Sequence, residues 1–127
     1  MAETGKKHIL VAEDDRAYAH IYEVKLTQEG FDVTIAADGE QALVAAKKHR
    51  PDLILLDLIM PGKDGFETLH DLKKDPNLAS IPVIAFSNLG QDEDIERTKK
   101  LGVADYLIKT NLSVHEMVEK VKEHLKD

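Results

Sequence analysis

A carboxylate interrupts the most apolar stretch of this chain, and this feature constrains the fold more than any other. Residues 53–60 read Leu-Ile-Leu-Leu-Asp-Leu-Ile-Met, the composition of a strand buried on both faces. An ionised Asp57 is costly there unless it lies at the strand's end and faces a cation or a polar crevice. Residues 60–65 are typical of a turn, so the strand ends there. A second acidic group, residues 13–15, follows the apolar run 9–12, and we expect both groups to share one site.

Length and composition narrow the class of protein. A chain of 127 residues suits a single domain with one core, over residues 1–127. Hydrophobic residues make up 43% and no run has transmembrane length, so we expect a soluble, cytoplasmic protein without a membrane partner. Residues 1–6 are a polar lead, expected to be disordered, without the apolar region of a signal peptide. The absence of cysteine excludes disulfides, thiolate zinc sites and cysteine nucleophiles, and a net charge of −7 argues against direct nucleic-acid binding.

Short apolar runs alternate with segments of helical period. We expect strands at residues 8–12, 31–36, 53–58, 81–86 and 104–108. Three acid or hydroxyl residues with a Glu or Gln three positions later predict reciprocal capping boxes: Asp38 with Gln41, Asp64 with Glu67, and Ser113 with Glu116. The highly charged segment 91–101 is expected to be the most weakly packed helix, anchored by Ile95 and Leu101.

Five repeats of strand and helix predict a parallel sheet covered on both faces. Ligands of such sheets bind outside the carboxyl ends of the strands. Polar residues close four of the five predicted strands there: the acidic pair 13–14, Asp57, Ser87 and Lys109. Crowded carboxylates without His or Cys favour a hard cation such as Mg²⁺. A carboxylate beside Mg²⁺ is a nucleophile toward phosphorus, with Lys109 supplying positive charge and Ser87 a hydroxyl.

Five segments in order resemble the response-regulator receiver family of two-component signalling, and in particular its chemotaxis regulators. They are residues 9–15 (ILVAEDD), 55–62 (LLDLIMPG), 64–65 (DG), 85–87 (AFS) and 102–109 (GVADYLIK). The resemblance extends from about Lys7 to the C-terminus. It implies a flavodoxin-like (βα)5 fold, a five-stranded parallel sheet in the order 2-1-3-4-5 with helices on both faces.

The resemblance also implies roles for the acidic residues. Asp57 would be the phosphoacceptor, and Asp14 would contact Mg²⁺ directly. Glu13 would act mainly through metal-bound water, and the backbone carbonyl of Ile59 would complete the protein ligands. Asp15 is better interpreted as the N-cap of the first helix.

Further implied roles, and two departures from the family, concern the last two strands. Ser87 would bind a phosphoryl oxygen and shift with it, and Tyr106 would be the aromatic switch behind it. Lys109 would contribute the positive charge from the fifth strand. Thr110 follows this lysine where the family usually has proline, so we expect a trans peptide and a differently shaped loop. Asn88 replaces a small residue and is expected to restrict access of the phosphodonor.

The resulting hypothesis is a phosphorylation-dependent switch without further enzymatic activity. A histidine kinase or phosphotransfer protein would phosphorylate it, and it would act on a downstream protein as a monomer or weak dimer. A Mg²⁺-dependent hydrolase is an alternative, although Ile59 stands where such enzymes commonly carry an acid/base Asp. A phosphorylation-independent interaction module is another, in which Asp57 is a structural acid paired with Lys109. Flavin binding fits least, because no Ser/Thr-rich loop follows the first strand. A single-domain regulator and an excised receiver are equally compatible with the sequence.

Overall fold

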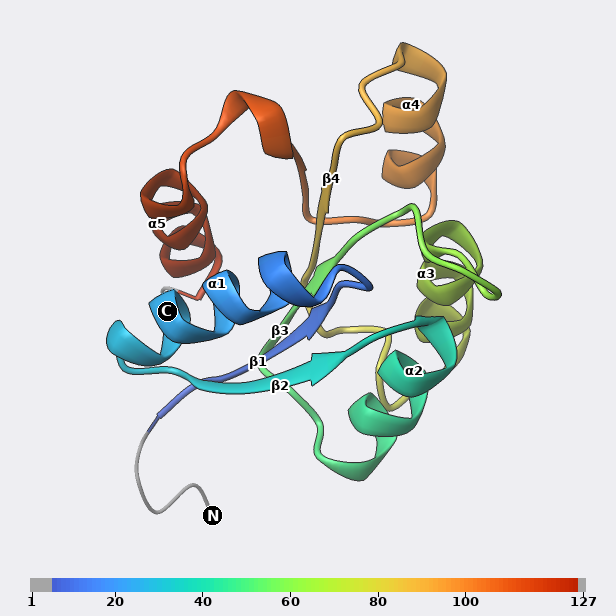
Figure 1. Ribbon diagram of the computed structural model, residues 1–127. Helices are drawn as coiled ribbons and strands as arrows, with labels where there is room; N and C mark the ends of the chain where they lie inside the picture. The colour runs from blue at the N-terminus through green and yellow to red at the C-terminus, as the bar shows by residue number, and fades with distance from the viewer. Residues whose placement is uncertain (1–5, 126–127) are drawn as a thin grey trace.

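The computed structural model describes residues 6–125, and the predicted lead therefore lies outside the described residues except for Lys6. Strands and helices alternate along the chain (Figure 1). The strands are β1 (His8–Ala12), β2 (Asp32–Ala36), β3 (Leu53–Leu56), β4 (Val83–Ser87) and β5 (Asp105–Ile108). The helices are α1 (Arg16–Gln28), α2 (Gly39–Lys48), α3 (Gly65–Lys74), α4 (Asp92–Lys100), the short 3₁₀ helix η1 (Lys109–Asn111) and α5 (Val114–His124).

The strands form one parallel sheet in the order β2-β1-β3-β4-β5, which confirms the predicted topology. The chain runs outward from β1 to β2, returns past β1 to β3, and continues outward to β5. The order therefore reverses between β1 and β3, the position at which parallel sheets of this kind bind their ligands. This is the edge at which the sequence predicts a site.

Helices cover both faces of the sheet, because successive side chains of each strand point to opposite faces. In β1, Ile9 and Val11 pack against α1 and α5, whereas Leu10 and Ala12 pack against α2 and α3. In Figure 1, α1 and α5 lie together on one side and α2, α3 and α4 on the other. Both faces of the central strands are therefore buried, as their continuous apolar composition predicts.

Two strands end differently from the prediction, and both differences affect the site. β3 ends at Leu56, so Asp57 follows the strand instead of lying inside it. Its N–H still donates to Ala12 O at 3.0 Å, which keeps the backbone aligned with β1. β4 begins at Val83 and not at residue 81, because Pro82 has no N–H to donate to the ladder, and it extends to Ser87.

The predicted N-terminal signals begin the helices, although only one is a full capping box. Ser113 and Glu116 bond reciprocally at the start of α5. At α2 the Asp38 side chain accepts from the Gln41 N–H, but the Gln41 side chain accepts from the Ala37 N–H instead of closing the box. At α1 the predicted cap is confirmed, since the Asp15 carboxylate accepts the N–H groups of residues 17 and 18.

The anchoring of α4 agrees with the prediction in part, since Leu101 packs against the core. Ile95 and Leu101 are only half-buried, and Thr98 is the buried residue of this helix. Its hydroxyl donates to the backbone carbonyl of Ile95 at 2.9 Å, which satisfies the group without a distant partner. A threonine among charged residues carries no hydrophobic signal, and so the apolar pattern missed it. Along the described residues 6–125, no helix has the length and apolarity to span a bilayer.

Candidate functional site

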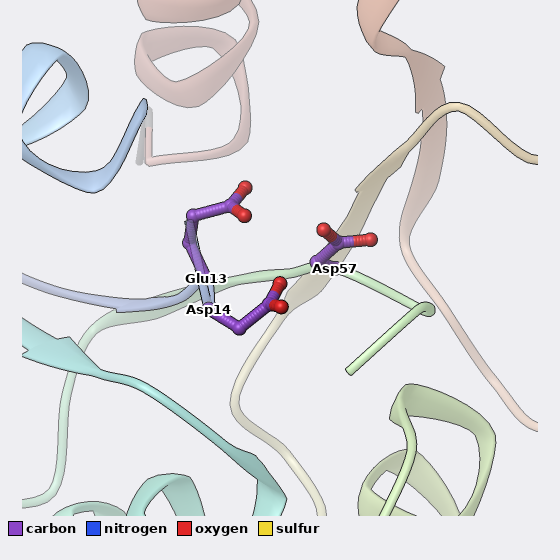
Figure 2. A group of neighbouring side chains, drawn as sticks. All are labelled: Glu13, Asp14 and Asp57. Atoms are coloured by element: carbon purple, nitrogen blue, oxygen red, sulfur yellow. The ribbon is translucent and has the colours of Figure 1, made fainter. Parts of the chain in front are cut away.

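Three carboxylates meet at the carboxyl edge of the sheet. Glu13 and Asp14 follow β1, and Asp57 follows β3, the two strands between which the order reverses. One oxygen from each lies within 4.8 Å of the others. Figure 2 shows the Asp14 and Asp57 carboxylates facing each other, with Glu13 beside them. Asp14 is exposed, whereas Glu13 and Asp57 are buried. The three acids that the sequence analysis placed in one site therefore lie together in the structure. Asp14 is the one that is accessible to solvent.

Both oxygens of Asp57 have protein partners. Oδ1 accepts the N–H of Ile59 at 3.0 Å, and Oδ2 accepts from Lys109 Nζ at 3.0 Å. The first bond is local and fixes the direction of the carboxylate with respect to its own loop. The second crosses from β3 to the end of β5. Two donors from different segments of the chain therefore fix the direction of the Asp57 carboxylate.

Lys109 bridges two of the acids. Its ammonium donates to Glu13 as well as to Asp57, with only 11% of the lysine side chain exposed. Burial lowers the pKa of Lys109, but the hydrogen bonds to Glu13 and Asp57 outweigh it and the pKa is raised. Burial raises the pKa of Glu13 despite the lysine. One ammonium against three carboxylates leaves two excess negative charges at the cluster.

Glu13 is held more firmly than Asp14. Its Oε1 accepts from Lys109, and its Oε2 accepts the N–H of Asp15 at 3.1 Å. Both oxygens are therefore engaged by protein donors. Asp57 is engaged in the same way, and Asp14 is the exposed acid of the three.

The two predicted switch residues lie on adjacent strands. Ser87 is fully buried at the end of β4, and its Oγ accepts weakly from the Leu89 N–H at 3.4 Å. Tyr106, on β5, is half-buried, and its hydroxyl donates to Leu89 O at 2.5 Å. Both side chains therefore contact the same loop between β4 and α4. Ile59 projects outward, with 54% of the residue exposed.

The turn after Asp57 is braced by contacts that the sequence analysis did not identify. Lys63 in this turn pairs with Asp71 on α3 and with Glu40 on α2. Gly65 begins α3 so close to the preceding strand end that an added Cβ would lie 2.4 Å from Asp57 O. Only glycine allows this approach. The sequence signal for the bracing was the lysine within the turn of residues 60–65.

Another contact missed from the sequence joins the two loops beside Ser87 and Lys109. The Thr110 N–H donates to Asn88 Oδ1 at 3.2 Å. Within the described residues no peptide bond is cis, so the Lys109–Thr110 bond is trans, as predicted. The loop has the shape of the 3₁₀ helix η1.

The chemistry of the donor set fits Mg²⁺. The cluster offers carboxylate oxygens without imidazole or thiolate, which suits a hard cation. Its two excess negative charges match a divalent ion. One acid is exposed, so a bound ion could keep water ligands, as Mg²⁺ usually does.

Comparisons with known proteins agree with this geometry. The family model of the response regulator receiver domain matches residues 9–122. The response regulator PleD of Caulobacter vibrioides is 42% identical over 101 residues, 80% of this chain and 22% of PleD. The DNA-binding response regulator MtrA of Mycobacterium tuberculosis is 33% identical over 124 residues, 98% of this chain and 53% of MtrA. The chain thus spans about a fifth to a half of these curated relatives.

Solved structures give the same result. The Mn²⁺-bound form of the response regulator Rcp1 superposes with a TM-score of 0.82 at 30% identity, covering 92% of each chain. Matches to the family model, to curated relatives and to a solved receiver structure all extend over most of the chain. The chain therefore belongs to the response regulator receiver domain family.

Proposed function

We propose that this domain accepts a phosphoryl group on Asp57 from a histidine kinase or phosphotransfer protein, in a Mg²⁺-dependent reaction. Phosphorylation then alters the surface that it presents to a downstream protein. The observation that carries the proposal is the buried Asp57 carboxylate, which lies against two further acids and accepts from Lys109 at 3.0 Å. Membership of the receiver family supports the same reading.

In the transfer step, an oxygen of Asp57 attacks phosphorus. An O–P bond forms as the bond from phosphorus to the donor's nitrogen or oxygen breaks, and the donor leaves with that electron pair. Positioning and neutralisation of charge on the phosphoryl oxygens are the main requirements of such a reaction. Lys109 supplies one positive charge, and Ser87 supplies a hydroxyl from the neighbouring strand.

Mg²⁺, when bound, supplies the remaining positive charge. Asp14 and Asp57 are the residues that would hold it, with Glu13 acting through water and Ile59 through its backbone carbonyl. The related response regulator Rcp1 binds the divalent cation Mn²⁺, which supports this assignment. In the absence of the phosphoryl group, Lys109 neutralises part of the acidic cluster by itself.

The surface that changes is formed by α4, β5 and α5 around Tyr106. Ser87 and Tyr106 both contact the loop that leads into α4, through Leu89. If Ser87 turns toward a phosphoryl oxygen, its contact with the Leu89 N–H is lost. The loop and Tyr106 are then released together, which biases α4 toward a second position. We expect the domain to work in the cytoplasm, as a monomer or weak dimer, without contacting nucleic acid itself.

Intact mass after treatment with acetyl phosphate and Mg²⁺ tests the proposal. We expect one added phosphoryl group in the parent and none in Asp57→Asn, which has a similar shape but a poor nucleophile. Omission of Mg²⁺ should also prevent the addition. No adduct with acetyl phosphate or any kinase would identify an interaction module instead. Catalytic turnover of external phosphate esters, abolished in Asp57→Asn, would identify a hydrolase.

A further inference from the structure

One hydrogen bond ties together the loops that carry the site's hydroxyl and its ammonium. Asn88 directly follows Ser87 at the end of β4, and Thr110 directly follows Lys109 after β5. The Asn88 side-chain oxygen accepts the Thr110 backbone N–H at 3.2 Å. In the sheet, Ser87 and Ile108 are paired neighbours. The side chain of Asn88 therefore extends the contact between β4 and β5 beyond the last paired residues of the two strands.

The turn that holds Lys109 has few other anchors. The 3₁₀ helix η1 buries none of its residues, and its bond from the Leu112 N–H to Lys109 O is internal to the turn. The lysine ammonium lies 5.5 Å from the Tyr18 ring centroid and 5.8 Å from the Phe86 ring centroid. Beside it is a pocket of about 200 Å³, lined in part by Asn88, Lys109 and Thr110. These contacts, like the ion pairs with Glu13 and Asp57, are made by the lysine side chain, whereas the bond to Asn88 acts on the backbone of its turn.

The identity of residue 110 makes the tie possible. A proline there would have no N–H to donate. It would also disfavour a helical conformation at the preceding residue, which here is Lys109 at the start of η1. Threonine allows both the donor and the 3₁₀ conformation. Asn88 supplies the matching acceptor, which a small apolar residue lacks.

We propose that Asn88 is a positioning residue for Lys109, acting through its hydrogen bond to the Thr110 amide. The bond fixes the turn that aims the ammonium at Asp57, and so favours phosphoryl transfer. This inference rests on the proposed function of Asp57. It also reverses the role expected for Asn88 from the sequence, because a side chain held toward Thr110 helps the reaction instead of obstructing the donor.

Amide exchange tests the bond without any phosphorylation. In the parent the Thr110 N–H should exchange slowly, and in Asn88→Ala it should exchange about two- to tenfold faster, the effect of losing one net hydrogen bond. Asn111→Ala, at an exposed position of the same turn, is the matched control and should leave this exchange unchanged. Equal Thr110 exchange in the parent and Asn88→Ala would overturn the proposal.

The effect on Lys109 is tested by phosphorylation with acetyl phosphate and by binding of beryllofluoride, a phosphoryl mimic. Asn88→Ala should lower both the rate and the affinity by about two- to tenfold at an unchanged melting temperature. Thr110→Pro removes the donor and should have a similar effect, whereas Thr110→Ser keeps the amide and should behave as the parent. Because Asn88 acts through the amide that proline removes, the Asn88→Ala/Thr110→Pro double variant should be no worse than Thr110→Pro alone.

Two outcomes would contradict the proposal. Faster phosphorylation of Asn88→Ala would mean that the side chain obstructs the donor. Additive losses in the double variant would mean that the two residues act independently. A parent that is not phosphorylated at all would reject the proposed function, whereas the Thr110 exchange result would still decide whether Asn88 holds the turn.

Discussion

Replacing Lys109 by methionine should make the stability of this domain strongly dependent on Mg²⁺. Methionine preserves much of the lysine's apolar length but removes the charge. The side chains of Glu13 and Asp57 are only 3% and 8% exposed, so water cannot replace the missing ammonium. Removing one partner of a buried ion pair costs about 3–5 kcal/mol, because the other charge stays buried without compensation.

Two effects adjust this magnitude. Burial already raises the pKa of Glu13, so its protonation in the variant limits the loss to the lower part of that range. Without Lys109 no ammonium competes with Mg²⁺ for the oxygens of Glu13 and Asp57, so Mg²⁺ should bind the variant more tightly than the parent. A cation bound only by the folded state stabilises it, by about 2.7 kcal/mol at one hundred times its dissociation constant. We therefore expect millimolar Mg²⁺ to recover more stability in Lys109→Met than in the parent.

Denaturant unfolding with and without Mg²⁺ measures both effects. Lys122→Met is the matched control, because its ion pair with Glu29 is exposed, with 42% of the lysine side chain accessible, and should contribute little to stability. The control should respond to Mg²⁺ as the parent does. A loss in Lys109→Met no larger than in Lys122→Met, or an equal Mg²⁺ response in all three proteins, would refute the electrostatic account of the cluster.

Three further predictions concern the surroundings of the site. The Ile59 side chain is exposed beside Asp57 and cannot hydrogen-bond the water that hydrolyses an aspartyl phosphate. Ile59→Asn should therefore lose its phosphoryl group faster than the parent after the donor is removed. Equal or slower decay in the variant would contradict this. In Gly39→Ala an added Cβ would lie 2.5 Å from a backbone oxygen, and overpacking should lower the free energy of unfolding by about 1–3 kcal/mol. Gly90→Ala is the control and should be nearly neutral, because its added Cβ would meet only the end of the Ile108 side chain, at 3.4 Å. The hydrogen bond from Lys63 lowers the pKa of Asp71 below its ordinary 3.8. The stabilisation that this ion pair gives the folded state is therefore present above pH 3.8 and is lost as the pH falls through the lowered pKa. The acid unfolding curves of the parent and Lys63→Met should converge at the pH where this stabilisation is lost.

The sequence predicted the architecture because its signals were strong and mutually consistent. Apolar runs of strand length, turn residues and helix caps all indicated alternating strands and helices, and parallel strands bring their carboxyl ends to one edge. The acids after β1 and β3 and the lysine after β5 therefore had to lie near one another. Strand limits were less certain: Asp57 proved to follow β3 because the ladder ends at Leu56.

Contacts made by exposed polar residues were not predictable in the same way. The bond from Thr110 to Asn88 and the pairing of Lys63 with two helices depend on how loops are placed after the sheet has formed. Neither contact has an apolar period or a fixed sequence spacing. The burial of Thr98 was not predicted for a related reason, because its hydroxyl is hydrogen-bonded within its own helix.

The position of Lys109 links the stability of the domain to its proposed chemistry. In the described structure its ammonium is shared between Glu13 and Asp57, both buried. A phosphoryl group on Asp57 brings oxygens that compete for the same ammonium, so the bond to Glu13 must weaken as transfer proceeds. If the turn were free, the lysine could leave the site at that moment. A tie that acts on the backbone at Thr110, and not on the ammonium, leaves the side chain able to exchange partners while its base stays fixed. The Asn88 bond is therefore placed where it can hold Lys109 without opposing the reaction.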